Sequence, residues 1–203
     1  HEDGHSHVLA STVPNCVSYD PTFGYEVVVI IQDGMRRMYE NNENVYYYVT
    51  VMNENYTQPE MPKGAEEGIR KGMYLLKQID ASKKSARVQL MGSGTILREV
   101  IAAAELLQKD FDIASDIWSA TSFTELGRDG MACERWNRMH PEAAPRLPFV
   151  AQCLEKRSGP VIAASDYMRA FPEQIRSNIS QKFVTLGTDG FGRSDTRANL
   201  REF

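Results

Sequence analysis

The chain has 203 residues, of which 42% are hydrophobic and 25% are charged, and its formal net charge is −4. This mixture is typical of a soluble globular protein and excludes a chain that is largely disordered. The longest apolar run, residues 27–31, is far shorter than the ~18 residues that a membrane helix needs. The acidic balance argues against nucleic-acid binding by bulk charge. We therefore expect neither a membrane nor a nucleic acid as a partner.

The first quarter of the chain predicts a strand–helix–strand unit. Residues 1–12 are polar and typical of a loop, and residues 13–19 predict a strand. Asp20 and Pro21 then supply a helix N-cap and a first-turn proline. A helix is expected over residues 25–40, because its apolar positions recur at the helical spacing: Val27, Ile30, Ile31, Gly34, Met35 and Met38. Residues 45–52, rich in aromatic and β-branched side chains, predict the second strand.

Residues 53–64 contain two prolines and few apolar side chains, and they predict a linker with a domain boundary near residue 60. Beyond it, strands and helices alternate, which is typical of βαβ units and a mostly parallel sheet. The predicted strands are residues 87–91, 116–121, 160–164 and 183–186. The predicted helices are residues 64–79, 96–109, 125–137 and 167–177. The fold class is therefore α/β, in two parts.

Cysteine content and the chain ends add two expectations. Cys16, Cys133 and Cys153 are an odd number of widely spaced cysteines, which predicts no disulfide framework and no zinc site and favours a reducing, cytoplasmic compartment. The chain begins HEDGHSH without an initiator methionine and stops inside a predicted helix. We therefore expect a fragment of a longer protein.

The opening residues hold an unusual cluster of histidines. His1, His5 and His7 alternate with Glu2 and Asp3, and such a loop can bind a metal or supply general acids near neutral pH. A solvated terminal tract fits the spacing equally well. A metal hydrolase would need more ligands downstream, where the chain offers a single further histidine, His140.

Four other motifs have simpler structural explanations. The GSGT turn, residues 92–95, follows a strand and precedes a helix, where α/β proteins bind phosphates, but a tight turn explains its glycines. Ser122 and Glu125 fit helix capping. Residues 187–200, GTDGFGRSDTRANL, fit an anion nest, an interface loop or a surface loop with local ion pairs. The tyrosines at residues 46–48 favour strand packing over a stacking platform for bases.

An ordered series of segments runs from the first residue to the last: HEDGHSH, NCVSYDPTFGYEVVVIIQDGMRRMY, ENVYYYVTVMNENY, MPKGAEEGIRKGMYLL, VQLMGSGTILREV, SFTELGRDG, CERWNRMHP and LGTDGFGRSDTRANLREF. This series resembles the homodimeric pyruvate dehydrogenase decarboxylating component of bacteria.

The resemblance implies a thiamine diphosphate enzyme of the transketolase type. Residues 1–60 resemble the end of its pyrimidine-binding domain, and residues 61–203 resemble its C-terminal α/β domain, truncated. The domain that binds the diphosphate and magnesium belongs to a missing part, so the resemblance implies no metal site and no cofactor ligand in this chain. The fragment alone is then expected to be inactive.

The resemblance also implies the reaction: decarboxylation of pyruvate, then acetyl transfer to the lipoyl groups of a dihydrolipoyl acetyltransferase partner, in a homodimer whose active site lies at the subunit interface. Such a pocket needs donors for a carboxylate and a developing oxyanion. His1 matches the family's pocket histidine. The EDGxxH pattern of transketolases maps onto Asp3 and His7, and His5 is the expected bystander.

Two hypotheses from other classes stay open. In the first, the C-terminal part is a non-catalytic dimerisation or assembly domain, with residues 92–95 and 188–195 as interface loops. In the second, a metal hydrolase uses His1, Asp3, His5 and His7, which predicts stoichiometric zinc.

Overall fold

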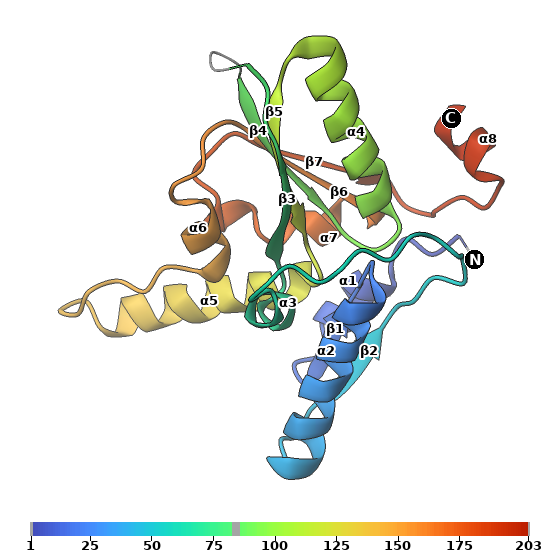
Figure 1. The fold of residues 1–203 in the computed structure, drawn as a ribbon. Helices are drawn as coiled ribbons and strands as arrows, with labels where there is room; N and C mark the ends of the chain where they lie inside the picture. The colour runs from blue at the N-terminus through green and yellow to red at the C-terminus, as the bar shows by residue number, and fades with distance from the viewer. Residues whose placement is uncertain (1, 83–85, 203) are drawn as a thin grey trace.

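The chain folds around two β-sheets (Figure 1). The computed structural model describes residues 2–82 and 86–202, so His1 lies outside the described residues. Strands β1 (Cys16–Tyr19) and β2 (Tyr46–Val49) form a parallel pair. The larger sheet has the order β3-β5-β4-β6-β7, built from β3 (Tyr74–Ile79), β4 (Arg87–Gly92), β5 (Ala114–Ser119), β6 (Val161–Met168) and β7 (Phe183–Thr188). Its β3–β5 pairing is antiparallel and its other pairings are parallel. The predicted α/β class with a mostly parallel sheet is confirmed.

Helices occupy most of the connections between strands. They are α1 (Ser6–Ser11), α2 (Gly24–Met35), which continues as the π-helical turn η1 (Arg36–Glu40), α3 (Glu66–Lys71), α4 (Ile96–Phe111), α5 (Phe123–Met139), α6 (Phe149–Leu154), α7 (Ala170–Glu173), the 3-10 turn η2 (Arg176–Asn178) and α8 (Arg197–Glu202). Within residues 2–82 and 86–202, no helix combines the length and the apolar character needed to cross a bilayer.

The larger sheet is covered on both faces. Because side chains alternate along a strand, Leu90 and Ile117 pack with α4, whereas Met91 and Trp118 pack with residues of α5, α6 and α7. Figure 1 shows α4 along one side of the sheet, with α5 and α6 away from α4. This arrangement leaves the carboxyl ends of the parallel strands free to meet the N-terminal part of the chain.

The predicted helix over residues 64–79 is half wrong. Helix α3 ends at Lys71, where Gly72 takes a left-handed φ of 107° and donates its amide to the carbonyl of Gly68. Glycine is the usual residue at this position. The residues that follow form β3, which pairs with β5. Pairing with a distant strand overrode the local helical pattern there.

The N-terminal predictions also need correction. Residues 6–11 form α1 instead of a loop. The helix predicted over residues 25–40 is confirmed as α2 and η1, and it begins at Gly24. Glu26, and not Asp20, accepts the amides of Thr22 and Phe23, which directly precede the helix. The buried face of α2 also differs from the predicted one, because Ile31 and Met35, which were expected on it, are each 53% exposed.

The remaining elements follow the predictions apart from one region. The helices expected at residues 96–109 and 125–137 are confirmed, as are all the predicted strands, within a few residues. The helix expected at residues 167–177 is largely wrong, because β6 continues to Met168 and the short elements α7 and η2 follow it. Helix α6 was not predicted.

The segments on either side of the predicted boundary pack against each other. Val17 and Tyr19 of β1 share an apolar cluster with Ile69 of α3 and Tyr74 of β3. Residues 53–64, the predicted linker, contain no helix or strand. The division into domains near residue 60 stays a prediction.

Candidate functional site

The N-terminal segment, defined here as residues 2–7, lies against the β7 loop, residues 188–195. The amide of Gly192 donates to the carbonyl of Glu2 at 3.0 Å, and the amide of Met168 donates to the carbonyl of Gly4 at 3.0 Å. A Cβ added at Gly4 would lie 1.9 Å from the carbonyl oxygen of Gly190. Two motifs from opposite ends of the chain are therefore neighbours, and glycine permits their close approach.

Asp3 is exposed and holds the start of α1. Its Oδ1 accepts the amides of His5 and Ser6, at 3.0 Å each, and its Oδ2 accepts the Ser6 hydroxyl at 2.5 Å. Partial burial raises the pKa of Asp3, but these hydrogen bonds outweigh it and the pKa is lowered. Asp3 is thus an ionised carboxylate that shapes the N-terminal segment.

His7 is fully buried in a cage of aromatic rings. Its ring stacks on Phe171, with ring centroids 4.7 Å apart, and meets Tyr167 and Tyr48 edge-on at 4.7 and 5.3 Å. Its Nε2 lies 3.0 Å from the Thr50 hydroxyl. Burial lowers the pKa of His7 to about 4, against the attraction of Asp3, which raises it. The imidazole is therefore neutral at pH 7.

Asp20 is a buried carboxylate at the carboxyl end of β1. Its Oδ1 accepts the Thr50 hydroxyl at 2.7 Å, and its Oδ2 accepts the Ser93 hydroxyl at 2.8 Å. Burial raises the pKa of Asp20 to about 6, although both hydrogen bonds lower it. The sequence reasoning missed Asp20 and Thr50 as partners of His7. A usable signal exists, because each directly follows a parallel strand, and such strand ends meet at one edge of a sheet.

The GSGT turn serves to hold Asp20. Gly94 has a left-handed φ of 48°, its amide donates to the Asp20 carbonyl at 2.9 Å, and a Cβ added there would lie 2.5 Å from both Asp20 carboxylate oxygens. The Asp20 carboxylate already accepts the hydrogen bond of the Ser93 hydroxyl, and its negative charge disfavours a phosphate at this turn. The interpretation as a tight turn is confirmed.

A pocket of about 710 Å³ opens beside these residues. It lies among the carboxyl end of β6, the β7 loop and the first turn of α4, and its lining includes Thr95, Asp166, Thr188, Phe191 and Arg197. Burial raises the pKa of Asp166, against the nearby Arg197, which lowers it. The described residues, 2–82 and 86–202, contain no group of three or more His, Cys, Asp or Glu side chains placed to hold a metal ion.

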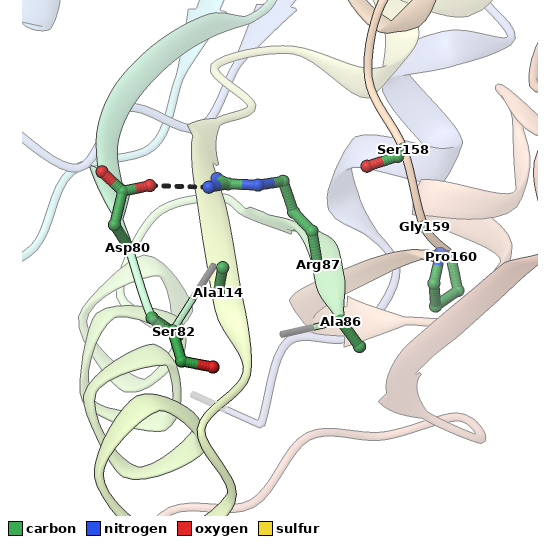
Figure 2. Close-up of a pocket in the computed structure, with 9 residues that line it drawn as sticks. Asp80, Ser82, Ala86, Arg87, Ala114, Ser158, Gly159 and Pro160 are labelled. Atoms are coloured by element: carbon green, nitrogen blue, oxygen red, sulfur yellow. Dashed lines mark hydrogen bonds and ion pairs between the residues drawn. The ribbon is translucent and has the colours of Figure 1, made fainter. Parts of the chain in front are cut away.

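A second pocket, of about 700 Å³, lies at the opposite edge of the sheet, near the amino ends of β4 and β6 (Figure 2). Figure 2 shows Arg87 turned toward Asp80 and away from Ser158 and Pro160. The guanidinium of Arg87 lies 2.6 Å from Asp80 and 2.5 Å from the buried Asp116. This pairing explains Arg87 structurally, and no predicted site residue lies there.

The other singled-out residues have structural contacts. Ser122 caps α5 by accepting the Glu125 amide at 3.0 Å, which confirms the capping interpretation. Tyr47 stacks on Tyr19, which confirms strand packing. His5 meets Phe191 of the β7 loop edge-on at 5.2 Å, and the distant His140 stacks on Trp136.

Comparisons with known proteins agree along the whole chain. Residues 72–203 match the family described as the transketolase-like TK C-terminal domain, and residues 1–59 match the pyruvate dehydrogenase E1 component middle domain. The chain is 60% identical to a pyruvate dehydrogenase E1 component of Pseudomonas aeruginosa, over 100% of the chain and 23% of the relative. It is 58% identical to one of Escherichia coli, over 99% of the chain and 22% of the relative. The chain thus spans less than a quarter of the length of these relatives.

Solved structures share the fold. A transketolase from Campylobacter jejuni superposes with a TM-score of 0.62 at 15% identity, covering 98% of this chain and 26% of that one. A transketolase from Leishmania mexicana gives a TM-score of 0.55 at 13% identity, over 98% of this chain and 24% of that one.

Proposed function

Because the chain belongs to the family of transketolase-like C-terminal domains, we propose that it is the corresponding part of a pyruvate dehydrogenase E1 component. The single observation that carries this proposal is the 52–60% identity to E1 components along the entire chain. The proposed activity is decarboxylation of pyruvate with acetyl transfer to the lipoyl groups of a dihydrolipoyl acetyltransferase, in a cytoplasmic homodimer.

The proposal places the ligands of thiamine diphosphate and magnesium outside this chain. The residues present do not fit such a site: the described part holds no carboxylate and histidine cluster for a cation, and Asp20 takes the place beside the GSGT turn where a diphosphate would meet donors. The chain by itself is accordingly proposed to be inactive.

Within the proposal, the chain supplies polar groups from its N-terminal segment. A histidine suits a pocket that must donate to the carboxylate of pyruvate and carry a proton near neutral pH. His1 takes this role, Asp3 shapes the backbone that follows it, and buried His7 holds the segment on the sheet edge. Because Asp3 is exposed, a second subunit can approach this edge.

The test replaces His1 in a full-length E1 component that contains this chain. We expect His1→Ala to lower kcat by about 100-fold or more, since the loss of one positioned donor or acid has this effect. His5→Ala is the matched control, because His5 lies four residues after His1 in the sequence and contacts Phe191. Its kcat should stay within about threefold of the parent. Turnover is measured as pyruvate-dependent acetylation of lipoyl groups.

Equal activity of His1→Ala and the parent would remove His1 from the chemistry. Loss of dimerisation on changing residues 92–95 or 188–195, with His1→Ala fully active, would favour the assembly-domain hypothesis instead.

A further inference from the structure

A line of hydrogen bonds runs from His7 to the GSGT turn through two intermediate residues. His7 Nε2 lies 3.0 Å from Thr50 Oγ1, which lies 2.7 Å from Asp20 Oδ1, and Ser93 Oγ lies 2.8 Å from Asp20 Oδ2. These residues come from α1, from the ends of β2 and β1, and from the turn after β4. His7, Asp20 and Ser93 are buried.

The chemistry of these groups sets the direction of each bond. An ionised carboxylate only accepts hydrogen bonds, and a hydroxyl carries one proton to donate. The Tyr167 hydroxyl, which carries its own proton to donate, interacts with Thr50. Besides His7, Thr50 Oγ1 also faces Asp20 Oδ1 and, at 3.4 Å, the carbonyl oxygen of Tyr19, and both are acceptors. Thr50 therefore uses its proton on one of them and accepts from His7, so the proton of the neutral imidazole must lie on Nε2.

We propose that Thr50 and Asp20 are positioning residues that hold His7 as its Nε2–H tautomer, so that His7 anchors the N-terminal segment and does not itself react. The second half of this proposal rests on the proposed function. The other ring nitrogen, Nδ1, is then an acceptor, and it is buried without a hydrogen-bond partner among the described residues.

Three neighbouring features support a single tautomer. Phe171 stacks on the ring at an interplanar angle of 20°, and Tyr48 and Tyr167 close its edges, which fixes the ring plane. The nearby ionisable groups are Asp3 of the N-terminal segment, which interacts with the ring electrostatically, and Tyr48 and Tyr167, which contact it. Asp20 lies beyond Thr50. None of these groups is cationic.

His7 fixes the position of the residues that the proposed reaction needs. His7 belongs to the first turn of α1, three residues after Gly4, and Gly4 is itself bonded to Met168 of β6. A ring that turned or shifted would move this segment, and displacements of about 1 Å can cost up to about 100-fold in rate.

The tautomer can be read directly by long-range ¹H–¹⁵N NMR on the chain labelled with ¹⁵N-histidine, with the His7 signals assigned by their loss in His7→Gln. We expect a pyrrole-type Nε2 and a pyridine-type Nδ1 in the parent and in Thr50→Ser. The isosteric Thr50→Val removes the acceptor and should lose this pattern. An Nδ1–H tautomer, or averaged nitrogen shifts, in the parent would overturn the proposal even if Thr50→Val failed to fold.

The anchoring role is tested in the full-length E1 component. Thr50→Val should lower kcat about tenfold with KM within about threefold, and Thr50→Ser should restore it. Thr12→Val, which alters a threonine at the other end of α1, is the control and should match the parent. Unchanged kcat in Thr50→Val would overturn the anchoring role. Full activity of His1→Ala would contradict the proposed function alone, because the NMR spectrum needs no turnover.

Discussion

Burial shifts the pKa values of two neighbouring residues in opposite directions. The pKa of Asp20 rises from 3.8 to about 6, and that of His7 falls from 6.5 to about 4. Both shifts have the same main cause, since removal from water disfavours the charged form of each group. The intervening Thr50 hydroxyl is bonded to both.

These shifts couple folding to pH with opposite signs. Folded Asp20 holds its proton more strongly than unfolded Asp20, so its contribution to stability grows as pH falls from about 6 to 3.8. Folded His7 holds its proton more weakly, so its contribution is lost as pH falls from 6.5 to about 4. The two effects oppose each other over almost the same range, and the parent should respond weakly to pH there.

Single variants should separate the two effects. Asp20→Asn removes the stabilisation that Asp20 gains on acidification but retains the destabilisation due to His7. Between pH 7 and pH 5, its free energy of unfolding should therefore fall by roughly 1–3 kcal/mol relative to that of the parent. His7→Gln should show the reverse. The measurement is urea unfolding at several pH values, and Asp189→Asn, which alters an exposed partner of Arg169, is the control. Parallel stability curves for all four proteins would contradict the prediction.

Among the elements, α8 is held in a different way from the others. None of its described residues is buried, and a helix of six residues is not stable by itself. Arg201 pairs with Glu99 of α4 at 2.8 Å, and Arg197 pairs with Glu99 at 3.4 Å and also with Glu54. Exposed ion pairs contribute about 0–1 kcal/mol each, so the docking of α8 depends on a small set of charges.

Removal of the shared carboxylate should release α8. In Glu99→Gln we expect amide hydrogen exchange of residues 197–202 to become about 3- to 10-fold faster, and 1 M salt should have the same effect on the parent. Glu105→Gln is the matched control, since Glu105 lies on the same helix and pairs with Lys77 at 4.0 Å. Equal acceleration in both variants would show that Glu99 has no specific role.

In the whole molecule, Glu26 is a second buried carboxylate, besides Asp20, that joins the two sheets. Glu26 of α2 accepts the Ser119 hydroxyl of β5 at 2.6 Å and the Tyr74 hydroxyl of β3 at 2.7 Å. It also accepts the amides of Thr22 and Phe23, which directly precede the helix. Burial raises its pKa, against these hydrogen bonds, which lower it. Together with the apolar cluster around Tyr19 and Ile69, this contact predicts that both sheets unfold together.

Glu26→Ala should strongly destabilise the whole chain. It leaves buried hydroxyl and amide donors without an acceptor, which costs roughly 3–5 kcal/mol. Glu43→Ala removes an exposed partner of Arg37 and should leave the stability almost unchanged. Urea unfolding followed by tryptophan fluorescence and by far-UV circular dichroism is the measurement. Separate transitions in the parent would contradict the expected single cooperative unit.

The fold was more predictable from sequence than the candidate site. Helices α4 and α5 carry long amphipathic patterns, and Ser122 caps α5 with a local bond, so nearby residues determine them. Residues 64–79 failed because half of them pair with β5, which a local pattern does not contain. The histidine-rich segment was recognised as unusual, but its helix, its cap by Asp3 and the burial of His7 were not predicted.

By itself, the sequence determined the strands other than β3, the long helices α4 and α5, the tight turn at GSGT and the family, because spacing, capping residues and identity are properties of the linear chain. Only the tertiary structure decided that His7, Thr50, Asp20 and Ser93 form one line of hydrogen bonds. These contacts join residues 43, 30 and 73 positions apart. They exist because parallel packing brings the carboxyl ends of separate strands to one buried edge, where low solvent access makes each unpaired polar group costly.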